Sequence, residues 1–193
     1  MQGIPLNERK RLGALLDDRP QTEVMAMIPQ FSQAETDNFV APPAQIPEAL
    51  GVLMFNMERG VNLPEIQEFL RDCPDIQPFD VILANELDDG CARSGNKNTA
   101  RELAQAFGLN YAWGLEFIEL VNDENAKGFH GNAVFSRWPI RRAGVIRLPE
   151  QYNWYFDRQK RIGGRLAVFA ELDVGGQPVG AVSIHLEKRT HGE

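Results

Sequence analysis

The chain has 193 residues, of which 43% are hydrophobic and 24% charged, and its formal net charge is −7. This is an ordinary composition for a soluble globular domain. No apolar run approaches the roughly 20 residues that span a bilayer, and the N-terminus lacks the apolar centre of a secretory signal. We therefore expect a cytoplasmic protein without a transmembrane segment. Cys73 and Cys91 have no metal-ligand spacing, which favours two reduced thiols.

The charge is unevenly distributed along the chain. Residues 1–136 contain 10 Lys/Arg and 21 Asp/Glu, whereas residues 137–165 contain 8 Lys/Arg and 2 Asp/Glu. A basic island in an acidic chain favours a local anionic partner over general adhesion to nucleic acid. The alternative interpretation is a solvated charged loop.

Residues 1–48 have the pattern of an N-terminal extension. They hold one possible short helix at residues 8–16, and prolines stand at positions 29, 42, 43 and 47. Such a stretch is more typical of a wrapping or linking arm than of a core. Its apolar residues 24–28 could dock on the domain that we expect over residues 49–193.

That domain begins with strand and helix patterns in alternation. Residues 50–56, LGVLMFN, are a short apolar run typical of a buried strand, and Pro64 opens an amphipathic helix, PEIQEFLRD. Residues 79–88, FDVILANELD, predict a second strand that ends in acids. Residues 98–107 predict an amphipathic helix closed by Gly108.

Strand patterns dominate the rest of the chain. LNYAWGLEFIEL and, after an acidic loop, NAVFS predict two further strands. RLAVFAELDVGGQPVGAVSIHLE alternates around Gly175 and Gly176, which is a hairpin signal. Alternating strands and helices followed by hairpins favour a mixed α/β sandwich over a purely parallel sheet.

Polar side chains recur where these strands end. Asn56 ends the first strand, Glu86 the second and His185 the last, and sites in α/β sheets collect at strand ends. Taken singly, each has an alternative role as a turn residue, a paired carboxylate or a core histidine. Together, an amide oxygen and a carboxylate suit Mg²⁺ or Mn²⁺ rather than zinc, and a histidine can hydrogen-bond a phosphoryl oxygen. The set predicts metal-assisted phosphoester hydrolysis.

Five segments then form a recognisable series: FNMERG, ANELD, GNAVFSRWPI, GGRLAVFAEL and SIHLE. From about Leu50 to the end, this series resembles the N-terminal part of the endonuclease/exonuclease/phosphatase superfamily, which includes deoxyribonuclease I, apurinic endonucleases, sphingomyelinases and inositol-polyphosphate phosphatases. The resemblance implies a four-layer α/β sandwich with two mixed β-sheets. Within GNAVFSRWPI, Gly131 permits a close backbone approach and Pro139 ends the strand.

The resemblance also implies roles for single residues. Asn56 and Glu86 match the family's metal-site asparagine and glutamate, although the family usually has Gln where Asn85 stands. His185 matches the histidine that contacts the scissile phosphate, so these three are our catalytic candidates. Arg165 matches an arginine that is more often structural than catalytic.

Two motifs that the resemblance implies do not occur in the sequence. They are a later Gly-Asp-x-Asn, which supplies the Asp that activates water, and a terminal Ser-Asp-His. We therefore expect a domain that is truncated at its C-terminus, with open sheet edges and apolar faces, and with little or no activity of the 193 residues alone. The alternatives are a non-catalytic module that binds a phosphate ligand and an inactive remnant.

The segment EQYNWYFDRQKRIGGR interleaves aromatic and basic residues. It could stack bases while pairing phosphates, dock a lipid headgroup or simply pack a loop. We assign Arg158 and Arg161 to substrate contact, together with His130, which could line the cleft, and Asn132. The expected partner is a phosphoester: a nucleic acid, a lipid, or a small phosphodiester or sugar phosphate. The sequence does not choose among these classes, and it does not fix the oligomeric state.

Overall fold

The structure is a computed structural model and describes residues 1–188. Its α-helices are α1 (Leu6–Ala14), α2 (Gln21–Ala26), α3 (Leu63–Asp72) and α4 (Thr99–Phe107). Its strands are β1 (Ala34–Asp37), β2 (Val52–Arg59), β3 (Val81–Asp89), β4 (Asn110–Glu119), β5 (Phe129–Ser136), β6 (Ile140–Arg147), β7 (Arg161–Gly163), β8 (Leu166–Val174) and β9 (Gln177–Ile184). Short 3₁₀ turns lie at η2 (Pro29–Ser32) and η5 (Trp154–Phe156).

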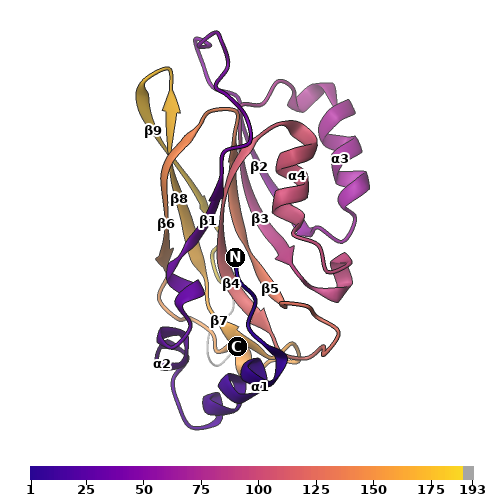
Figure 1. Cartoon of the computed structure of the whole chain (residues 1–193), viewed down its shortest axis with the longest axis vertical. Helices are drawn as coiled ribbons and strands as arrows, with labels where there is room; N and C mark the ends of the chain where they lie inside the picture. The colour runs from indigo at the N-terminus through magenta and orange to yellow at the C-terminus, as the bar shows by residue number, and fades with distance from the viewer. Residues whose placement is uncertain (189–193) are drawn as a thin grey trace.

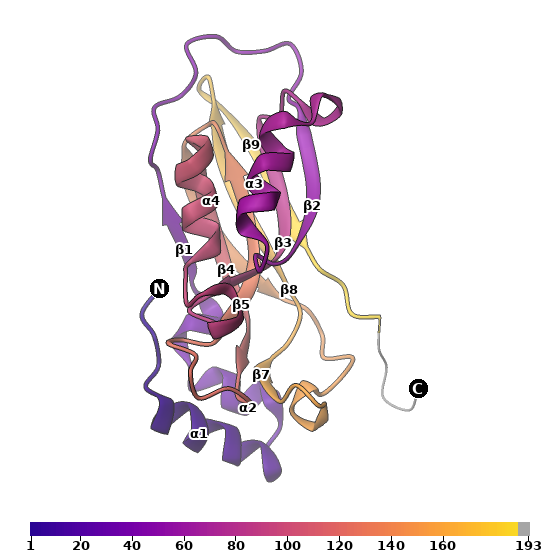
Figure 2. The same ribbon diagram turned by 90° about the vertical axis from the view of Figure 1, so that its right-hand side faces the viewer.

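Two sheets pack face to face (Figure 1). The larger sheet is mixed: its strands follow the order β1-β4-β5-β3-β2, β7 also pairs with β4, and β2 runs parallel to β3. The smaller sheet, β6-β8-β9, is antiparallel. Helices α3 and α4 cover the outer face of the larger sheet (Figure 2). The α/β sandwich with two sheets that the sequence predicted is confirmed, and residues 1–188 build its helical layer and both sheets. Both sheets were expected to be mixed, whereas among the described strands only the larger sheet is mixed.

The helices that cover the larger sheet have the predicted ends. At the start of α4, Asn98 Oδ1 accepts a hydrogen bond from the Arg101 backbone N–H at 2.9 Å, which satisfies a donor that the helix leaves open. At its end, Gly108 adopts a φ of 60°, a conformation that glycine enters without steric cost. Pro64 lies in the first turn of α3, where its missing N–H removes no helical bond.

Two apolar cores hold the layers together. One lies between the helices and the larger sheet and includes Leu70, Leu103 and Trp113. The other lies between the two sheets and includes Trp138 and Val168. Strands β4 and β5 are buried along their whole length, because each contributes side chains to both cores. Residues on these strands are consequently held in fixed positions.

The N-terminal segment 1–48 wraps the domain and also supplies part of its core. Val24 and Ile28, which were expected to dock, are buried beside Phe31 in the first core. Strand β1 pairs antiparallel with β4 and forms an edge of the larger sheet. The sequence predicted neither α2 nor β1. A helix of six residues and a strand of four are too short to show a period.

Gly131 makes the close backbone approach that its position predicted. A Cβ atom there would overlap the Gly114 carbonyl oxygen and lie 2.8 Å from Trp113 Cε2 on β4. Strand β5 ends at Ser136, and Pro139 separates it from β6. The close packing of β5 on β4 therefore requires a residue without a side chain.

Two arginines of the basic island, Arg141 and Arg142, lie on β6 and are already paired. Arg141 Nη2 is 2.8 Å from Asp173 Oδ1, and Arg142 Nη2 is 2.7 Å from Glu171 Oε2. Exposed pairs of this kind contribute little stability, and they leave little charge for a partner. For this part of the island, the solvated alternative is the better description.

Both sheets expose apolar side chains. They are Val52 and Met54 on β2, Ile146 on β6, and Val182 and Ile184 on β9. Within residues 1–188, no helix covers the outer face of the smaller sheet (Figure 1). Apolar faces of this kind were expected from the sequence. Of the described helices, none has the length and apolar character needed to cross a membrane.

Candidate functional site

Two bulges in the neighbouring strands β2 and β3 lie side by side at the candidate site. The sequence placed Asn56 and Glu86 at strand ends, whereas β2 runs on to Arg59 and β3 to Asp89. The parallel register of β2 and β3 shifts between Asn56 and Arg59, and the register of β3 with β5 shifts between Ala84 and Leu87. At these positions Glu58, Arg59 and Glu86 have φ angles of 45°, 68° and 60°. Residues other than glycine rarely adopt such angles. Bulges re-aim side chains, and retained strain is typical of functional sites.

Glu86 is held in this conformation by its neighbour strand. Asn132 on β5 is fully buried, and its Oδ1 accepts a hydrogen bond from the Glu86 backbone N–H at 3.2 Å. The ladder cannot pair that N–H because the bulge turns it away. The Glu86 side chain stays 23% exposed, so its carboxylate is available to a ligand.

Two side chains bring β9 to the same place. Ser183 Oγ donates to the Ala84 carbonyl oxygen at 2.9 Å, and Asn85 Nδ2 donates to the Ile184 carbonyl oxygen at 3.3 Å. The next residue after β9, His185, therefore reaches Glu86, with 3.9 Å between His185 Nε2 and Glu86 Oε1. Asn85 therefore ties the two sheets together.

Asn56 completes the predicted trio on the adjacent strand, where the bulge of β2 begins. It is exposed and pairs in register with Asn85. Its Oδ1 accepts the Glu58 backbone N–H at 2.9 Å, and an amide oxygen has a second lone pair for another partner. The structure thus brings Asn56, Glu86 and His185 to neighbouring positions at one edge of the sandwich.

Glu116 on β4 is a site residue that sequence reasoning missed. It is fully buried, with Oε1 3.0 Å from Arg165 Nη1. Its Oε2 lies 3.8 Å from His130 Nε2 and 3.8 Å from His185 Nδ1. Burial raises the pKa of this carboxyl, but His185, Arg165 and His130 outweigh burial and hold it below its usual value. The signal was an acid in the middle of the apolar run LNYAWGLEFIEL, where an unpaired charge would be costly.

His130 lies behind Glu116 rather than at the surface. It is 2% exposed, and its Nδ1 lies 2.9 Å from Asp88 Oδ1. Asp88 also accepts two bonds from Arg93, at 2.7 and 2.8 Å. Burial raises the pKa of the Asp88 carboxyl, but the bonds from Arg93 and His130 lower it to about 2. Asp88 is therefore a carboxylate at neutral pH and fixes the ring of His130.

A polar cavity of about 520 Å³ opens beside these residues. Its lining includes Arg59, Glu86, His130, Arg158, Arg161 and Arg165. Within the described residues, Arg59 and Arg158 have no carboxylate within ion-pair distance, and Arg59 Nε is buried without a hydrogen-bond partner. Arg59 is consequently able to bind an anion in this cavity, and no pattern in the sequence had indicated this role.

Arg161 and the aromatic residues of its loop are placed differently. Arg161 is buried, 2.9 Å from Glu119, and lies over the rings of Phe117 and Trp154. Trp154 and Tyr155 are buried too, whereas Phe156 is 69% exposed. For Trp154 and Tyr155, the loop-packing alternative describes the structure better than base stacking does.

The side chains at the site can be compared with the ligands that a metal ion requires. Within residues 1–188, no group of three or more His, Cys, Asp and Glu side chains is arranged to hold one. Glu86 and Asn56 nevertheless offer two oxygen donors on adjacent strands. Mg²⁺ is often bound through only one or two carboxylates, with water and substrate phosphate completing its shell. The residues present therefore fit a magnesium site of the open kind and do not fit a closed protein cage.

No family model matches the chain, and no curated protein matches it. Among solved structures, the fold is similar to an endonuclease/exonuclease/phosphatase family protein from Leptotrichia buccalis C-1013-b, with a TM-score of 0.49 and 18% identity, over 72% of this chain and 55% of that one. It is also similar to SmcL, with a TM-score of 0.44 and 13% identity, over 72% and 48%. A third similar structure is the 3′ phosphatase NExo from Neisseria bound to product DNA hairpin, with a TM-score of 0.39 and 19% identity, over 71% and 41%. The chain spans about half the length of these structures.

Proposed function

We propose that this chain carries the metal- and phosphate-binding part of a metal-dependent phosphoesterase of the endonuclease/exonuclease/phosphatase kind, with phosphodiester hydrolysis as its reaction. The observation that supports this most strongly is the meeting of Asn56, Glu86 and His185 at two adjacent bulges. Strained backbone persists only where the surroundings hold it. Here the hydrogen bond from the Glu86 N–H to Asn132 holds Glu86 in its left-handed conformation. That conformation costs stability, and the use of the Glu86 carboxylate in binding would explain why the chain retains it.

Glu86 and Asn56 would hold Mg²⁺ or Mn²⁺. Both ions prefer oxygen ligands, and the exposed fraction of Glu86 leaves room for water and substrate oxygens. When bound, the ion polarises the phosphoryl group and stabilises the leaving oxygen. The protein's own contribution is to fix the two donors at neighbouring bulges of two paired strands.

His185 would donate a hydrogen bond to a phosphoryl oxygen. Arg165 Nη1 lies 2.9 Å from His185 Nδ1, and a guanidinium has only donors, so Nδ1 accepts. In the neutral ring the proton is then on Nε2, the nitrogen that faces Glu86. Glu116 fixes Arg165 from below at 3.0 Å. This arrangement presents an N–H at the position where the substrate phosphate would approach the metal donors.

The arginines would bind the remaining charge of the substrate. Arg59 and Arg158 line the polar cavity, and both lack a carboxylate partner in the described part of the chain. This same observation favours the second candidate function, a module that binds phosphate without a metal and without catalysis. Nucleic acid, lipid and small phosphodiesters all present the phosphate that these groups would recognise.

Calorimetric titration separates the two functions. Mg²⁺ is titrated into the chain, into Glu86→Gln, and into Glu65→Gln, which removes the same charge from the exposed first turn of α3. We expect binding heat from the wild type and from Glu65→Gln and none from Glu86→Gln. Equal binding by Glu86→Gln would sink the metal assignment.

A second titration uses bis(p-nitrophenyl) phosphate with and without Mg²⁺. If the chain is part of a phosphoesterase, we expect Mg²⁺ to strengthen the binding of bis(p-nitrophenyl) phosphate, because the ion would bridge the protein and the phosphate. Metal-independent binding that Arg59→Met weakens would instead support the binding module.

A further inference from the structure

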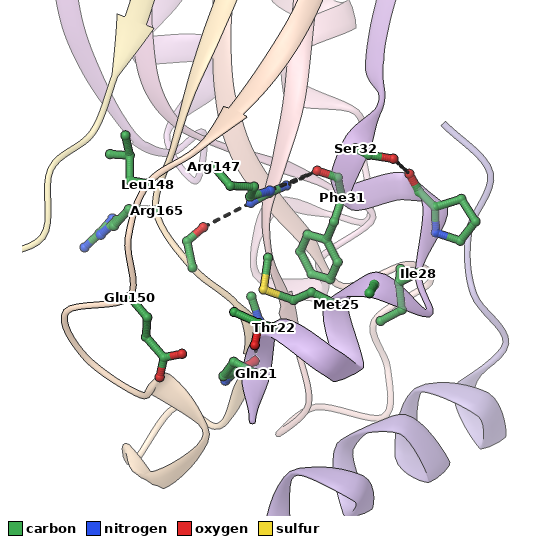
Figure 3. Close-up of a pocket in the computed structure, with 14 residues that line it drawn as sticks. Gln21, Thr22, Met25, Ile28, Phe31, Ser32, Arg147, Leu148, Glu150 and Arg165 are labelled. Atoms are coloured by element: carbon green, nitrogen blue, oxygen red, sulfur yellow. Dashed lines mark hydrogen bonds between the residues drawn. The ribbon is translucent and has the colours of Figure 1, made fainter. Parts of the chain in front are cut away.

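A second pocket lies away from the bulges, between the N-terminal segment and the end of β6 (Figure 3). Its volume is about 340 Å³, within the lower part of the range for small-molecule sites, roughly 300–1,000 Å³. The apolar lining comes from α2, from η2 and the residue before it, and from the residue after β6: Met25, Ala26, Ile28, Pro29, Phe31 and Leu148.

Arg147 brings a positive charge to this apolar pocket. Its guanidinium donates four hydrogen bonds, all to backbone carbonyl oxygens: two to Phe31, at 2.9 and 2.7 Å, one to Gly164 at 3.1 Å, and one to Leu115. Figure 3 shows the bond to Phe31 at one end of the pocket. A guanidinium has five N–H donors, so one on Nη1 is left over.

That charge has no counter-ion among the described residues. None of their carboxylates lies within ion-pair distance of Arg147. Burial lowers the pKa of Arg147 to about 10, with Glu116 opposing the shift, so the group remains a cation at neutral pH. A cation withdrawn from water is costly unless it is paired. The carbonyl oxygens that accept hydrogen bonds from Arg147 offset part of that cost, but they carry no net charge, so the positive charge of Arg147 is not neutralised.

The other charged side chains of the pocket do not supply the missing anion. Arg165 points away from the pocket (Figure 3) and is paired with Glu116 and Glu187. Glu150 is exposed on the opposite side of the pocket from Phe31, and no ion pair joins it to Arg147. The pocket therefore combines an apolar body with one unpaired cation at its end.

We propose that this pocket binds a monocarboxylate with an apolar body, of the size of a medium-chain fatty acid, with the carboxylate on Arg147 and the chain against Met25, Ile28 and Phe31. A carboxylate accepts the free N–H and cancels the charge, while the apolar walls exclude water from the chain. This site is distinct from the bulges at Asn56 and Glu86, and the inference does not depend on the proposed function.

The test uses decanoate as the probe and 1-decanol as its uncharged counterpart, each titrated calorimetrically. We expect decanoate to bind with a stoichiometry of one and 1-decanol to bind about tenfold more weakly, because a charge-assisted bond contributes at least that factor. Arg147→Met should remove the preference for decanoate. Glu150→Gln should tighten decanoate binding, because it removes the acid that lines the pocket.

A second variant, which fills the pocket with a large side chain, tests the same proposal if Arg147→Met fails to fold. Ala26→Trp fills the pocket from an exposed position on α2, and Glu23→Trp places the same ring on α2 outside the pocket lining. We expect the first variant to abolish decanoate binding and the second to leave it unchanged. The proposal is overturned if the wild type does not bind decanoate, if 1-decanol binds equally well, or if Ala26→Trp binds as the wild type does.

Discussion

Asn132 Oδ1 accepts the backbone N–H of Glu86 at 3.2 Å, and this one hydrogen bond joins the buried centre of the larger sheet to the bulge of β3. It explains why Glu86 can keep a left-handed backbone with a φ of 60°. It also shows that Asn132, which we expected to contact substrate, is buried behind Glu86. The contact of Asn132 with substrate stays a prediction, whereas its contact with Glu86 is part of the structure.

Removing the Asn132 amide should disturb the site as well as the fold. Asn132→Ala leaves the Glu86 N–H without a partner, which costs about 1–3 kcal/mol, and it frees the bulge that aims the carboxylate. We expect a lower free energy of unfolding in urea and weaker Mg²⁺ binding. The matched control is Asn110→Ala, which removes a buried acceptor of the Val40 N–H. If the two variants lose Mg²⁺ affinity equally, the bulge does not position Glu86.

Acid should weaken the fold through Asp88. The pKa of its carboxyl is about 2 in the folded chain, because bonds from Arg93 and His130 outweigh the opposing effect of burial, against 3.8 as the reference. A folded pKa below the unfolded one means that the carboxylate stabilises the fold above about pH 4. That contribution, roughly 2 kcal/mol, is lost as pH falls from about 4 to about 2.

The measurement is the pH dependence of the unfolding free energy for wild type, Asp88→Asn and Asp173→Asn. Asp173 is paired with Arg141 at the surface, where solvent screens the pair. We expect Asp88→Asn to be less stable at pH 6 and flatter on the acid side, and Asp173→Asn to follow the wild type. Parallel curves for wild type and Asp88→Asn would contradict the assignment.

Gly131 should tolerate no side chain. Gly131→Ala places a methyl group against the Gly114 carbonyl oxygen and the Trp113 ring, and overpacking of this kind costs about 1–3 kcal/mol or more. Gly144→Ala on β6 is the control, because nothing lies within 4 Å of its Cβ position. Thermal unfolding should separate the two variants clearly. Equal melting temperatures would show that β5 can move away from β4.

Arg59 should contribute to phosphate binding. Its guanidinium lines the polar cavity, and its Nε is buried without a partner, so Arg59→Met removes a charged donor. A charge-assisted hydrogen bond contributes about 1.5–3 kcal/mol, so the affinity for bis(p-nitrophenyl) phosphate should fall about tenfold or more. Arg141→Met, which removes a surface arginine already paired with Asp173, should leave it unchanged. The reverse ranking of the two variants would contradict this role.

Local chemistry predicted much of the fold. Asn98, Gly108 and Pro64 mark the helix ends that the structure shows, because caps depend on neighbouring residues alone. The hairpin at Gly175 and Gly176 was likewise predicted correctly. Strand β6 was missed, because it carries arginines on its exposed side instead of a regular apolar alternation.

The site was predicted where the end of an apolar run marks it in the sequence, and it was missed where only the folded structure brings residues together. Glu86 and His185 end apolar runs, so the sequence singles them out. Glu116 lies in the middle of a buried strand and meets His185 only because the smaller sheet packs on the larger one, with β8 on β4 and β9 on β3 and β5, which no local pattern shows. The sequence did not indicate Arg59 for a related reason. The left-handed backbone that orients its side chain depends on the pairing of β2 with β3.

The central claim is that Asn56 and Glu86 together hold a divalent ion. The most direct test adds Mn²⁺ to ¹⁵N-labelled chain and maps which backbone amide signals the paramagnetic ion broadens. We predict broadening centred on the bulges of β2 and β3, around residues 56 and 86, reaching His185 and disappearing in Glu86→Gln. Broadening centred on any other part of the chain, or an unchanged pattern in Glu86→Gln, would contradict the account.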